Sequence, residues 1–278
     1  MSFHAEQPAA MGIHYLYYPV GRMLSLQKAA GYRSVELRGG APHILLTPEG
    51  IGNLEEIRRE VPASGMRVVC VTPENCSYPC QFAARGQALV SASREYFRNG
   101  LRLASELECP LMAVNSGWGL ADEPREEAMK RSLDMIAWLA DQAGPLGVTL
   151  VMESLRPEES NLVNSLPATV EFLKTLGRAN LRPMVDTCAM AVAGETLEDW
   201  FAAFPGSIAH MHFVDGTPYG HLAWGDGDRS LTGYLAVLEE NGYTGALTQE
   251  ITDGRYFSDP QAADRKSMAA FRPYFQEA

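Results

Sequence analysis

Short apolar runs alternate along the chain with longer stretches in which apolar residues recur every three or four positions. A continuous apolar run of four to eight residues is typical of a strand buried on both faces, whereas the recurring pattern indicates a helix with one apolar face. Eight runs of the first kind alternate with eight stretches of the second kind over 278 residues. This alternation predicts a single (β/α)₈ barrel, the TIM barrel, rather than an open doubly wound sheet.

The bounds of the expected elements follow from the pattern and from capping residues. The expected strands are 11–18, 34–38, 66–72, 110–115, 149–155, 181–187, 208–215 and 245–251. The expected helices are 21–30, 53–61, 86–108, 122–143, 167–176, 196–204, 231–241 and 260–275, with Asp122, Ser165 and Thr196 as N-caps and Gly31 as a C-cap. No linker-like block divides the chain, so residues 1–278 are expected to form one domain. Residues 1–10 are small and polar and are expected to form an N-terminal arm on the surface.

Four of the expected strands carry a carboxylate or an imidazole at their C-terminal ends, where barrel enzymes place their chemistry. These residues are Glu153, Asp186, His212 and Glu250. Three carboxylates that lie close together at the mouth of a barrel, where the dielectric constant is low, repel one another. Either their pKa values rise or a cation lies between them. Three oxygen ligands and one imidazole suit one divalent metal ion, such as Mn²⁺, Co²⁺, Ni²⁺ or Mg²⁺.

Two further residues belong to the same strand ends. His210 and His212 alternate on one strand and face the same side of the sheet, so His210 is expected one layer below, holding a neighbouring carboxylate. Glu36, in the second expected strand, lies inside or near the mouth. The sequence does not identify its partner.

Composition narrows the class of partner. A net charge of −11 and a pI near 5.1 argue against nucleic acid phosphates and favour small neutral or cationic substrates. The five cysteines form an odd set typical of reduced cysteines in the cytosol, and a redox or metal pair of Cys76 and Cys80 is the weaker interpretation. Without a leader sequence or an apolar run approaching about 18 residues, the protein is expected to be cytoplasmic and to have no membrane partner.

Several short motifs, in this order along nearly the whole chain, resemble those of a known family. They are Glu36-Leu37-Arg38-Gly39-Gly40-Ala41-Pro42-His43, Thr72-Pro73-Glu74, Tyr78-Pro79, Glu153, Glu159-Ser160-Asn161, Met184-Val185-Asp186, His210-Met211-His212, Val214-Asp215 and Glu250. The chain resembles the sugar isomerases and epimerases of the xylose isomerase-like barrel superfamily. Within that superfamily it is similar to ketose 3-epimerases, and most of all to the fructoselysine 3-epimerases.

This resemblance implies an activity and a role for each strand-end residue. It implies a metal ion held by Glu153, Asp186, His212 and Glu250, with Glu153 and Glu250 also acting as the two proton-transfer bases. Epimerisation at C3 removes a weakly acidic C–H proton, so a cation must stabilise the enediolate that is left. Inversion then needs one acid or base on each face of the substrate. Homo-oligomers are common in this family, so a homo-oligomer is also expected.

The substrate is less well defined by the sequence. Ala189 and Pro218 stand where simple ketose 3-epimerases carry a histidine and an arginine, which argues against a plain ketohexose, whereas Glu159 matches a substrate-binding glutamate. The lysine part of a fructoselysine-like substrate needs an anionic contact, for which Glu74 or the pair Asp226 and Asp228 are candidates.

Three other residues are candidates for substrate contact. His43 is expected either to contact substrate or to pack its own loop, Trp118 either to stack on the sugar or to pin its loop, and His221 is a weaker candidate.

Other functions on the same barrel remain open at this point. A ketohexose 3-epimerase of the tagatose or psicose type, another sugar isomerase or an inosose dehydratase would use the same metal chemistry. An endonuclease IV-like nuclease needs three zinc ions, more than six histidines and a basic groove, so the charge of −11 argues against it. A non-catalytic sugar-binding protein would not need all four ligands.

Overall fold

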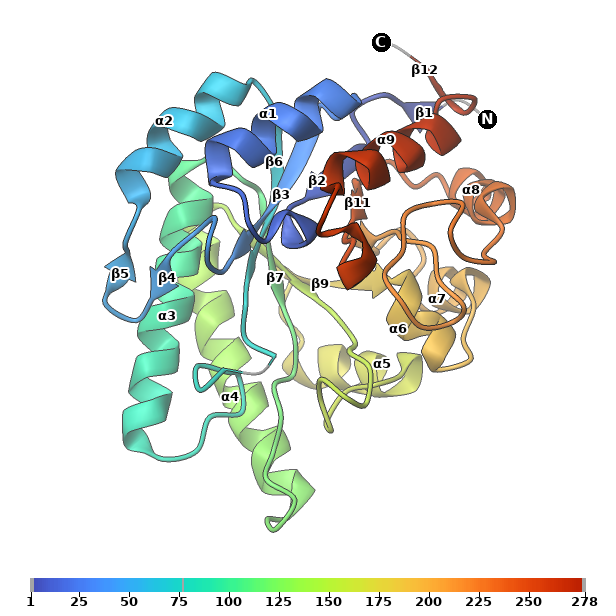
Figure 1. The fold of residues 1–278 in the computed structure, drawn as a ribbon. Helices are drawn as coiled ribbons and strands as arrows, with labels where there is room; N and C mark the ends of the chain where they lie inside the picture. The colour runs from blue at the N-terminus through green and yellow to red at the C-terminus, as the bar shows by residue number, and fades with distance from the viewer. Residues whose placement is uncertain (1–2, 77, 277–278) are drawn as a thin grey trace.

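A computed structural model describes residues 3–76 and 78–276 and shows a closed barrel of eight parallel strands surrounded by helices (Figure 1). The order around the barrel is β10, β11, β2, β3, β6, β7, β8 and β9. Their bounds are β2 (Pro8–Met11), β3 (Ser34–Gly39), β6 (Arg67–Pro73), β7 (Leu111–Val114), β8 (Thr149–Met152), β9 (Leu181–Asp186), β10 (His210–His212) and β11 (Leu247–Gln249). The predicted (β/α)₈ barrel is confirmed.

The helices follow the predicted order, and most ends agree with the predicted ends within three residues. They are α1 (Val20–Ala30), α2 (Leu54–Ser64), α3 (Gln87–Glu106), α4 (Arg125–Ala143), α5 (Leu166–Leu176), α6 (Thr187–Val192), α7 (Leu197–Ala203), α8 (Leu231–Glu240) and α9 (Pro260–Phe271). Gly31 ends α1 in the left-handed conformation, and Ser165 and Thr196 cap α5 and α7, as predicted. Within residues 3–76 and 78–276, no helix combines the length and the apolar character needed to cross a membrane.

Two predictions about helices are wrong. Asp122 does not cap α4, because that helix begins at Arg125 and Pro124 occupies the capping position. The short helix α6 was not expected at all; it begins directly after β9, with the carboxylate of Asp186 accepting a hydrogen bond from the backbone N–H of Cys188.

The prediction of an N-terminal arm is also wrong for the residues that the structure describes. Residues 8–11 form β2, which pairs with β11 on one side and β3 on the other and so closes the barrel. Ala9 and Ala10 are completely buried there. Small residues with weak strand propensity fit this crowded position, which explains why the pattern did not reveal the strand. Of the expected strand 11–18, only Met11 is in a strand, and Ile13–Tyr15 form a turn of 3₁₀ helix.

Small elements complete the fold. The hairpin β4 (Leu46–Thr47) and β5 (Gly50–Ile51) follows β3, and the first and last described strands, β1 (Phe3–His4) and β12 (Phe275–Gln276), pair with each other (Figure 1).

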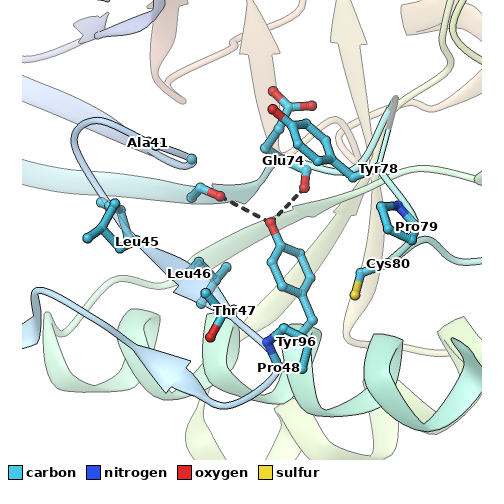
Figure 2. Close-up of a pocket in the computed structure, with 13 residues that line it drawn as sticks. Ala41, Leu45, Leu46, Thr47, Pro48, Glu74, Tyr78, Pro79, Cys80 and Tyr96 are labelled. Atoms are coloured by element: carbon cyan, nitrogen blue, oxygen red, sulfur yellow. Dashed lines mark hydrogen bonds between the residues drawn. The ribbon is translucent and has the colours of Figure 1, made fainter. Parts of the chain in front are cut away.

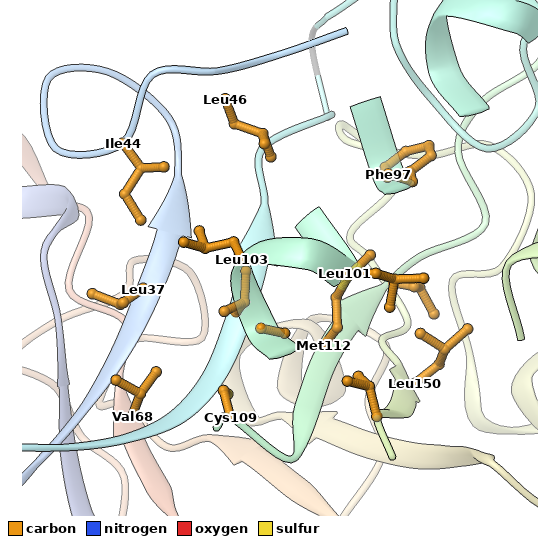
Figure 3. Packing of buried hydrophobic residues seen from close by; sticks show 14 of the residues in the cluster. Leu37, Ile44, Leu46, Val68, Phe97, Leu101, Leu103, Cys109, Met112 and Leu150 are labelled. Carbon is orange, nitrogen blue, oxygen red and sulfur yellow. The ribbon is translucent and has the colours of Figure 1, made fainter. Parts of the chain in front are cut away.

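Apolar side chains fill the layer between helices and strands and the interior of the barrel below the strand ends. Figure 3 shows Phe97, Leu101 and Leu103 of α3 packing in the layer between this helix and the strands. A separate cluster includes Val151 and Met184, which lie two residues before Glu153 and Asp186 and therefore on the same face of their strands. The strand-end carboxylates consequently stand above an apolar floor.

Candidate active site

Four consecutive strands of the barrel deliver the four predicted ligands to one place. Glu153 follows β8, Asp186 ends β9, His212 ends β10 and Glu250 follows β11. The Nδ1 atom of His212 lies 2.8 Å from Oε1 of Glu153 and 3.1 Å from Oε2 of Glu250. All four side chains are largely buried, Glu250 being the most exposed at 16%.

The other ring nitrogen of His212 meets Glu36. The Nε2 atom of His212 lies 3.0 Å from Oε1 of Glu36, and Nε2 of His210 lies 2.6 Å from Oε2 of the same residue. Thr72 donates a hydrogen bond from its hydroxyl to Glu36. These contacts identify the partners of Glu36 that the sequence left open, and they place His210 one layer below the mouth against a carboxylate, as predicted.

A fifth side chain, His221, enters the mouth from the loop after β10. Its Nε2 atom lies 3.0 Å from Oδ2 of Asp186 and 3.4 Å from Oε2 of Glu250. The other ring nitrogen, Nδ1, lies 3.3 Å from the hydroxyl of Thr252. Sequence reasoning treated His221 as a weak candidate because a histidine in a loop has no periodic signal.

The ionisable side chains at this end of the barrel shift one another's pKa values. Burial raises the pKa of Glu153 to about 7, and the neighbouring Glu250 and Asp186 add to this rise against the opposing effect of His212. Burial would likewise raise the pKa of Asp186, but His221 outweighs it and holds that pKa below its usual range. Burial would lower the pKa of His221, yet Asp186 and Glu250 raise it to about 9.

The donor set fits a divalent cation. Glu153, His212 and Glu250 offer one atom each within 4.8 Å of one another, and so do Asp186, His221 and Glu250. Carboxylate oxygens and imidazole nitrogens are ligands for Mn²⁺, Co²⁺ and Zn²⁺. In metal sites the second nitrogen of a ligand histidine is usually held by another polar group, as Glu36 holds His212 here.

The catalytic cavity, which we define as the cavity above these carboxylates, is small. Its volume is about 50 Å³, and Glu153, Asp186, His221 and Glu250 line it. Two of the predicted substrate contacts, Glu74 and Glu159, also line it. Each is paired with an arginine: Nε of Arg38 donates to Glu74 over 2.6 Å, and Nε of Arg156 donates to Glu159 over 3.0 Å.

Two predicted substrate contacts lie elsewhere. His43 is buried, does not line the catalytic cavity and has its Nε2 atom 3.1 Å from the carbonyl oxygen of Tyr15, so the structure favours loop packing for this residue. Trp118 lines a neighbouring groove beside Glu159 rather than the catalytic cavity.

Sequence reasoning missed several polar groups in the cavity. Arg38, Asn75 and Asn115 line it, and the amide nitrogen of Asn115 donates to the amide oxygen of Asn75 over 2.7 Å. The position of Asn115, directly after β7, is the signal that could have revealed it, because Glu153 and Glu250 likewise come directly after β8 and β11.

Residues 24–274 match the xylose isomerase-like TIM barrel family. The chain belongs to this family. It is 24% identical over 249 residues to a fructoselysine 3-epimerase of Escherichia coli O157:H7, an alignment that covers 89% of this chain and 90% of the relative. Among its relatives are sugar epimerases and isomerases, and the protein is an isomerase of this kind.

Solved structures show the same fold. The 3-keto-D-glucoside 4-epimerase of E. coli superposes with a TM-score of 0.79 at 16% identity, covering 96% of this chain and 99% of that chain. A structure of the IolI protein with a bound zinc atom superposes with a TM-score of 0.73 at 18% identity, covering 97% of this chain and 99% of that chain.

Proposed function

We propose that the protein is a metal-dependent sugar 3-epimerase that inverts C3 of a ketose or of a ketosamine such as fructoselysine. The observation that carries the proposal is the convergence of Glu153 and Glu250, from β8 and β11, on the same nitrogen of His212. The similarity to a fructoselysine 3-epimerase over most of both chains supports the ketosamine.

Inversion of a carbon next to a ketone needs two groups that exchange protons with opposite faces of the substrate. In our proposal, a carboxylate oxygen of Glu153 or Glu250 removes the C3 proton from one face, and the other residue delivers a proton to the opposite face. Burial and nearby carboxylates favour the protonated form of one acid, which is the form that can deliver a proton.

Glu153, Asp186, His212 and Glu250 are the proposed metal ligands. A divalent cation would stabilise negative charge on the oxygens of the substrate when bound. Glu36 holds the ring of His212 in place from below, and His221 faces Asp186 from the rim. Arg38, Asn75, Asn115 and Glu159 provide hydrogen-bonding groups around the space that is left for the sugar hydroxyls.

Proton NMR in D₂O tests this function. Fructoselysine and a free ketohexose are incubated separately with the protein and Mn²⁺, and the metal is removed before recording. We expect loss of the C3 proton signal and appearance of the C3 epimer. Glu153→Gln and Glu250→Gln should each slow the exchange by about 10² or more. Glu158→Gln, an exposed carboxylate outside the catalytic cavity, is the matched control.

The outcomes separate the remaining candidates. Exchange with the ketohexose alone would assign a ketose 3-epimerase of the tagatose or psicose type. Exchange at wild-type rates in both glutamine variants would contradict the proposal. Absence of exchange with either sugar would direct the search to inososes and smaller hydroxyketones.

A further inference from the structure

A second and larger cavity adjoins the catalytic cavity on the side of β3 and β6. Its volume is about 350 Å³, within the range of small-molecule sites, and we call it the side pocket. One wall is the segment 39–48, from the end of β3 into β4, and the other is formed by residues 78–80 and Tyr96 of α3 (Figure 2). Ile44, Leu46, Pro48 and Pro79 contribute aliphatic surface to it.

Hydrogen bonds hold both walls in place. The Tyr96 hydroxyl lies 3.0 Å from the carbonyl oxygen of Gly39 and 2.6 Å from that of Glu74, and so ties the end of β3 to the end of β6 (Figure 2). Asn99 of α3 donates to the carbonyl oxygens of Thr47 and Pro48 over 3.0 and 3.1 Å, which fixes the β4–β5 hairpin. A pocket that is formed before a ligand arrives costs little ordering when the ligand binds.

Glu74 connects the two cavities, because it lines both of them. The catalytic cavity, at about 50 Å³, is much the smaller of the two. The side pocket is therefore the adjoining space with the larger volume for a substituent carried by the sugar.

The side pocket does not offer a free charge to such a substituent. Glu74 is the one carboxylate among its described lining residues, and Arg38 already neutralises it. The Tyr96 hydroxyl is occupied by two carbonyl oxygens. Of the other two acids considered for a lysine tail, Asp226 is paired with Lys266 and accepts from the Tyr256 hydroxyl over 2.7 Å. Asp228 is exposed and lines neither cavity.

We propose that the side pocket binds an apolar, uncharged substituent of the sugar substrate, an alkyl or aryl group. This inference rests on the proposed epimerase function and specifies its substrate class. An alkyl or aryl group would be buried against the aliphatic lining of the side pocket. The ammonium and carboxylate groups of an amino acid tail would lose their bound water there without gaining a hydrogen-bonding or charged partner.

Three substrates test the inference: D-fructose, fructoselysine and 1-deoxy-1-(hexylamino)-D-fructose. The last two share the amine at C1 and differ in the charged groups of the tail. We expect kcat/KM for C3 exchange to be at least tenfold higher for the hexylamino compound than for fructoselysine, since each buried methylene contributes about threefold or fourfold.

Leu45→Lys places an ammonium group at the rim of the side pocket without burying it, because Leu45 is 41% exposed. It should lower kcat/KM for the hexylamino compound about tenfold and leave that for D-fructose unchanged. Leu146→Lys is the matched control, because Leu146 is 43% exposed and lines neither cavity.

Each alternative result has a distinct meaning. Exchange with D-fructose or fructoselysine but no gain from the hexyl group would overturn the side-pocket inference and leave the epimerase function standing. An unchanged value for the hexylamino compound in Leu45→Lys would also overturn it. No exchange with any of the three substrates would overturn the epimerase function and this inference together.

Discussion

His212 connects two layers of the site through its two ring nitrogens. Nδ1 faces Glu153 and Glu250 at the mouth, while Nε2 faces Glu36, which is completely buried. Burial would raise the pKa of Glu36, but His212 and His210 outweigh it and hold that pKa well below its usual range. Glu36 is therefore an ionised carboxylate beneath the mouth, and it fixes the ring that we propose as a metal ligand.

The substitution Glu36→Gln tests this positioning role. Glutamine preserves the size of the side chain but removes its charge, so the ring of His212 is held less firmly and is less basic. We expect Mn²⁺ affinity to fall about 10-fold to 100-fold, the usual cost of losing a group that orients a metal ligand. Isothermal titration with Mn²⁺ measures this directly.

A control variant separates positioning from general damage. Glu123→Gln removes a carboxylate that is paired with Arg131 and lines neither cavity. Its Mn²⁺ affinity should equal that of the wild type. Wild-type affinity in Glu36→Gln would show that Glu36 does not orient the ligand.

His43 provides a prediction about pH and stability. Burial, with smaller effects of Arg38 and His14, lowers its pKa to about 4, whereas the pKa of an unfolded histidine is about 6.5. The unfolded chain therefore binds a proton in a range where the folded chain does not. The contribution of neutral His43 to the free energy of unfolding is complete above about pH 6.5 and is lost as the pH falls towards 4.

Urea unfolding at pH 7.5 and pH 5 measures this loss. The wild type should lose about 2 kcal/mol more of its free energy of unfolding between these pH values than His43→Gln does. His4→Gln, at an exposed histidine of β1, should behave like the wild type. An equal loss in His43→Gln and the wild type would mean that His43 is not held neutral.

At this scale the sequence located the four strand-end residues where the structure has them, and their role as ligands stays a prediction. Each stands at the end of an apolar run, and a charge there is costly unless it has a function. His43 and Trp118 were harder to place, because a residue in a loop has no period that tells which way its side chain points. The two histidine partners of Glu36 lie 174 and 176 residues away in sequence, so only the closed barrel could reveal them.

Among the elements, the loop between β10 and α8 brings His221 into the site. Asp215 is buried at its start, and the carboxylate accepts hydrogen bonds from the backbone N–H groups of Gly216, Gly225, Gly227 and Arg229 over 2.8 to 3.1 Å. The segment 225–229 thus wraps around this carboxylate. The loop folds around one carboxylate and holds His221 against Asp186.

The substitution Asp215→Asn should loosen this loop. An amide group accepts weaker hydrogen bonds than a carboxylate, and its NH₂ group would face backbone donors. We expect a loss of about 1–3 kcal/mol in the free energy of unfolding and faster proteolysis within residues 216–229. Exchange at C3 should slow as well, because His221 would no longer be held.

Limited proteolysis with mass spectrometry locates the cleavage sites. Asp228→Asn, at an exposed position of the same loop, should leave the cleavage pattern unchanged. Equal resistance of Asp215→Asn and the wild type would show that the carboxylate does not hold the loop.

The helices were predictable where the sequence contains a local stop or cap. Ser165, Thr196 and Gly31 act at short range through backbone groups of their own helix ends, so sequence alone locates them. Helix α6 has only six residues and no amphipathic repeat. Its N-cap is Asp186, a residue for which the sequence already predicts the role of a metal ligand.

For the whole molecule, alternation of strands and helices was sufficient to predict a closed barrel. The point of closure was not predictable, because Pro8, Ala9 and Ala10 have low strand propensity and form a strand only between β11 and β3. Their burial is a consequence of the complete ring. The identity of the substrate and the side pocket were likewise not predictable, because they depend on loops that come together only in the folded barrel.

Metal binding should stabilise the entire barrel, since four of its eight strands contribute the proposed ligands. A ligand that binds only the folded state at 100 times its Kd adds about 2.7 kcal/mol, which corresponds to a rise of roughly 5–10 °C in Tm. We expect this rise when Mn²⁺ is added to protein treated with EDTA, measured by differential scanning fluorimetry. C3 exchange should be lost with EDTA and restored with Mn²⁺.

Asp186→Asn is the decisive comparison for this effect, because Asp186 has two separate roles. Its Oδ1 atom caps α6 by accepting from the N–H of Cys188 over 2.7 Å, and asparagine is an equally good N-cap. The variant should therefore keep its helix while losing an anionic ligand, so its fold should survive and its response to Mn²⁺ should shrink to a small fraction of the wild-type shift. A full shift in Asp186→Asn would mean that the ion binds elsewhere, and the assignment of the four strand ends as ligands would have to be abandoned.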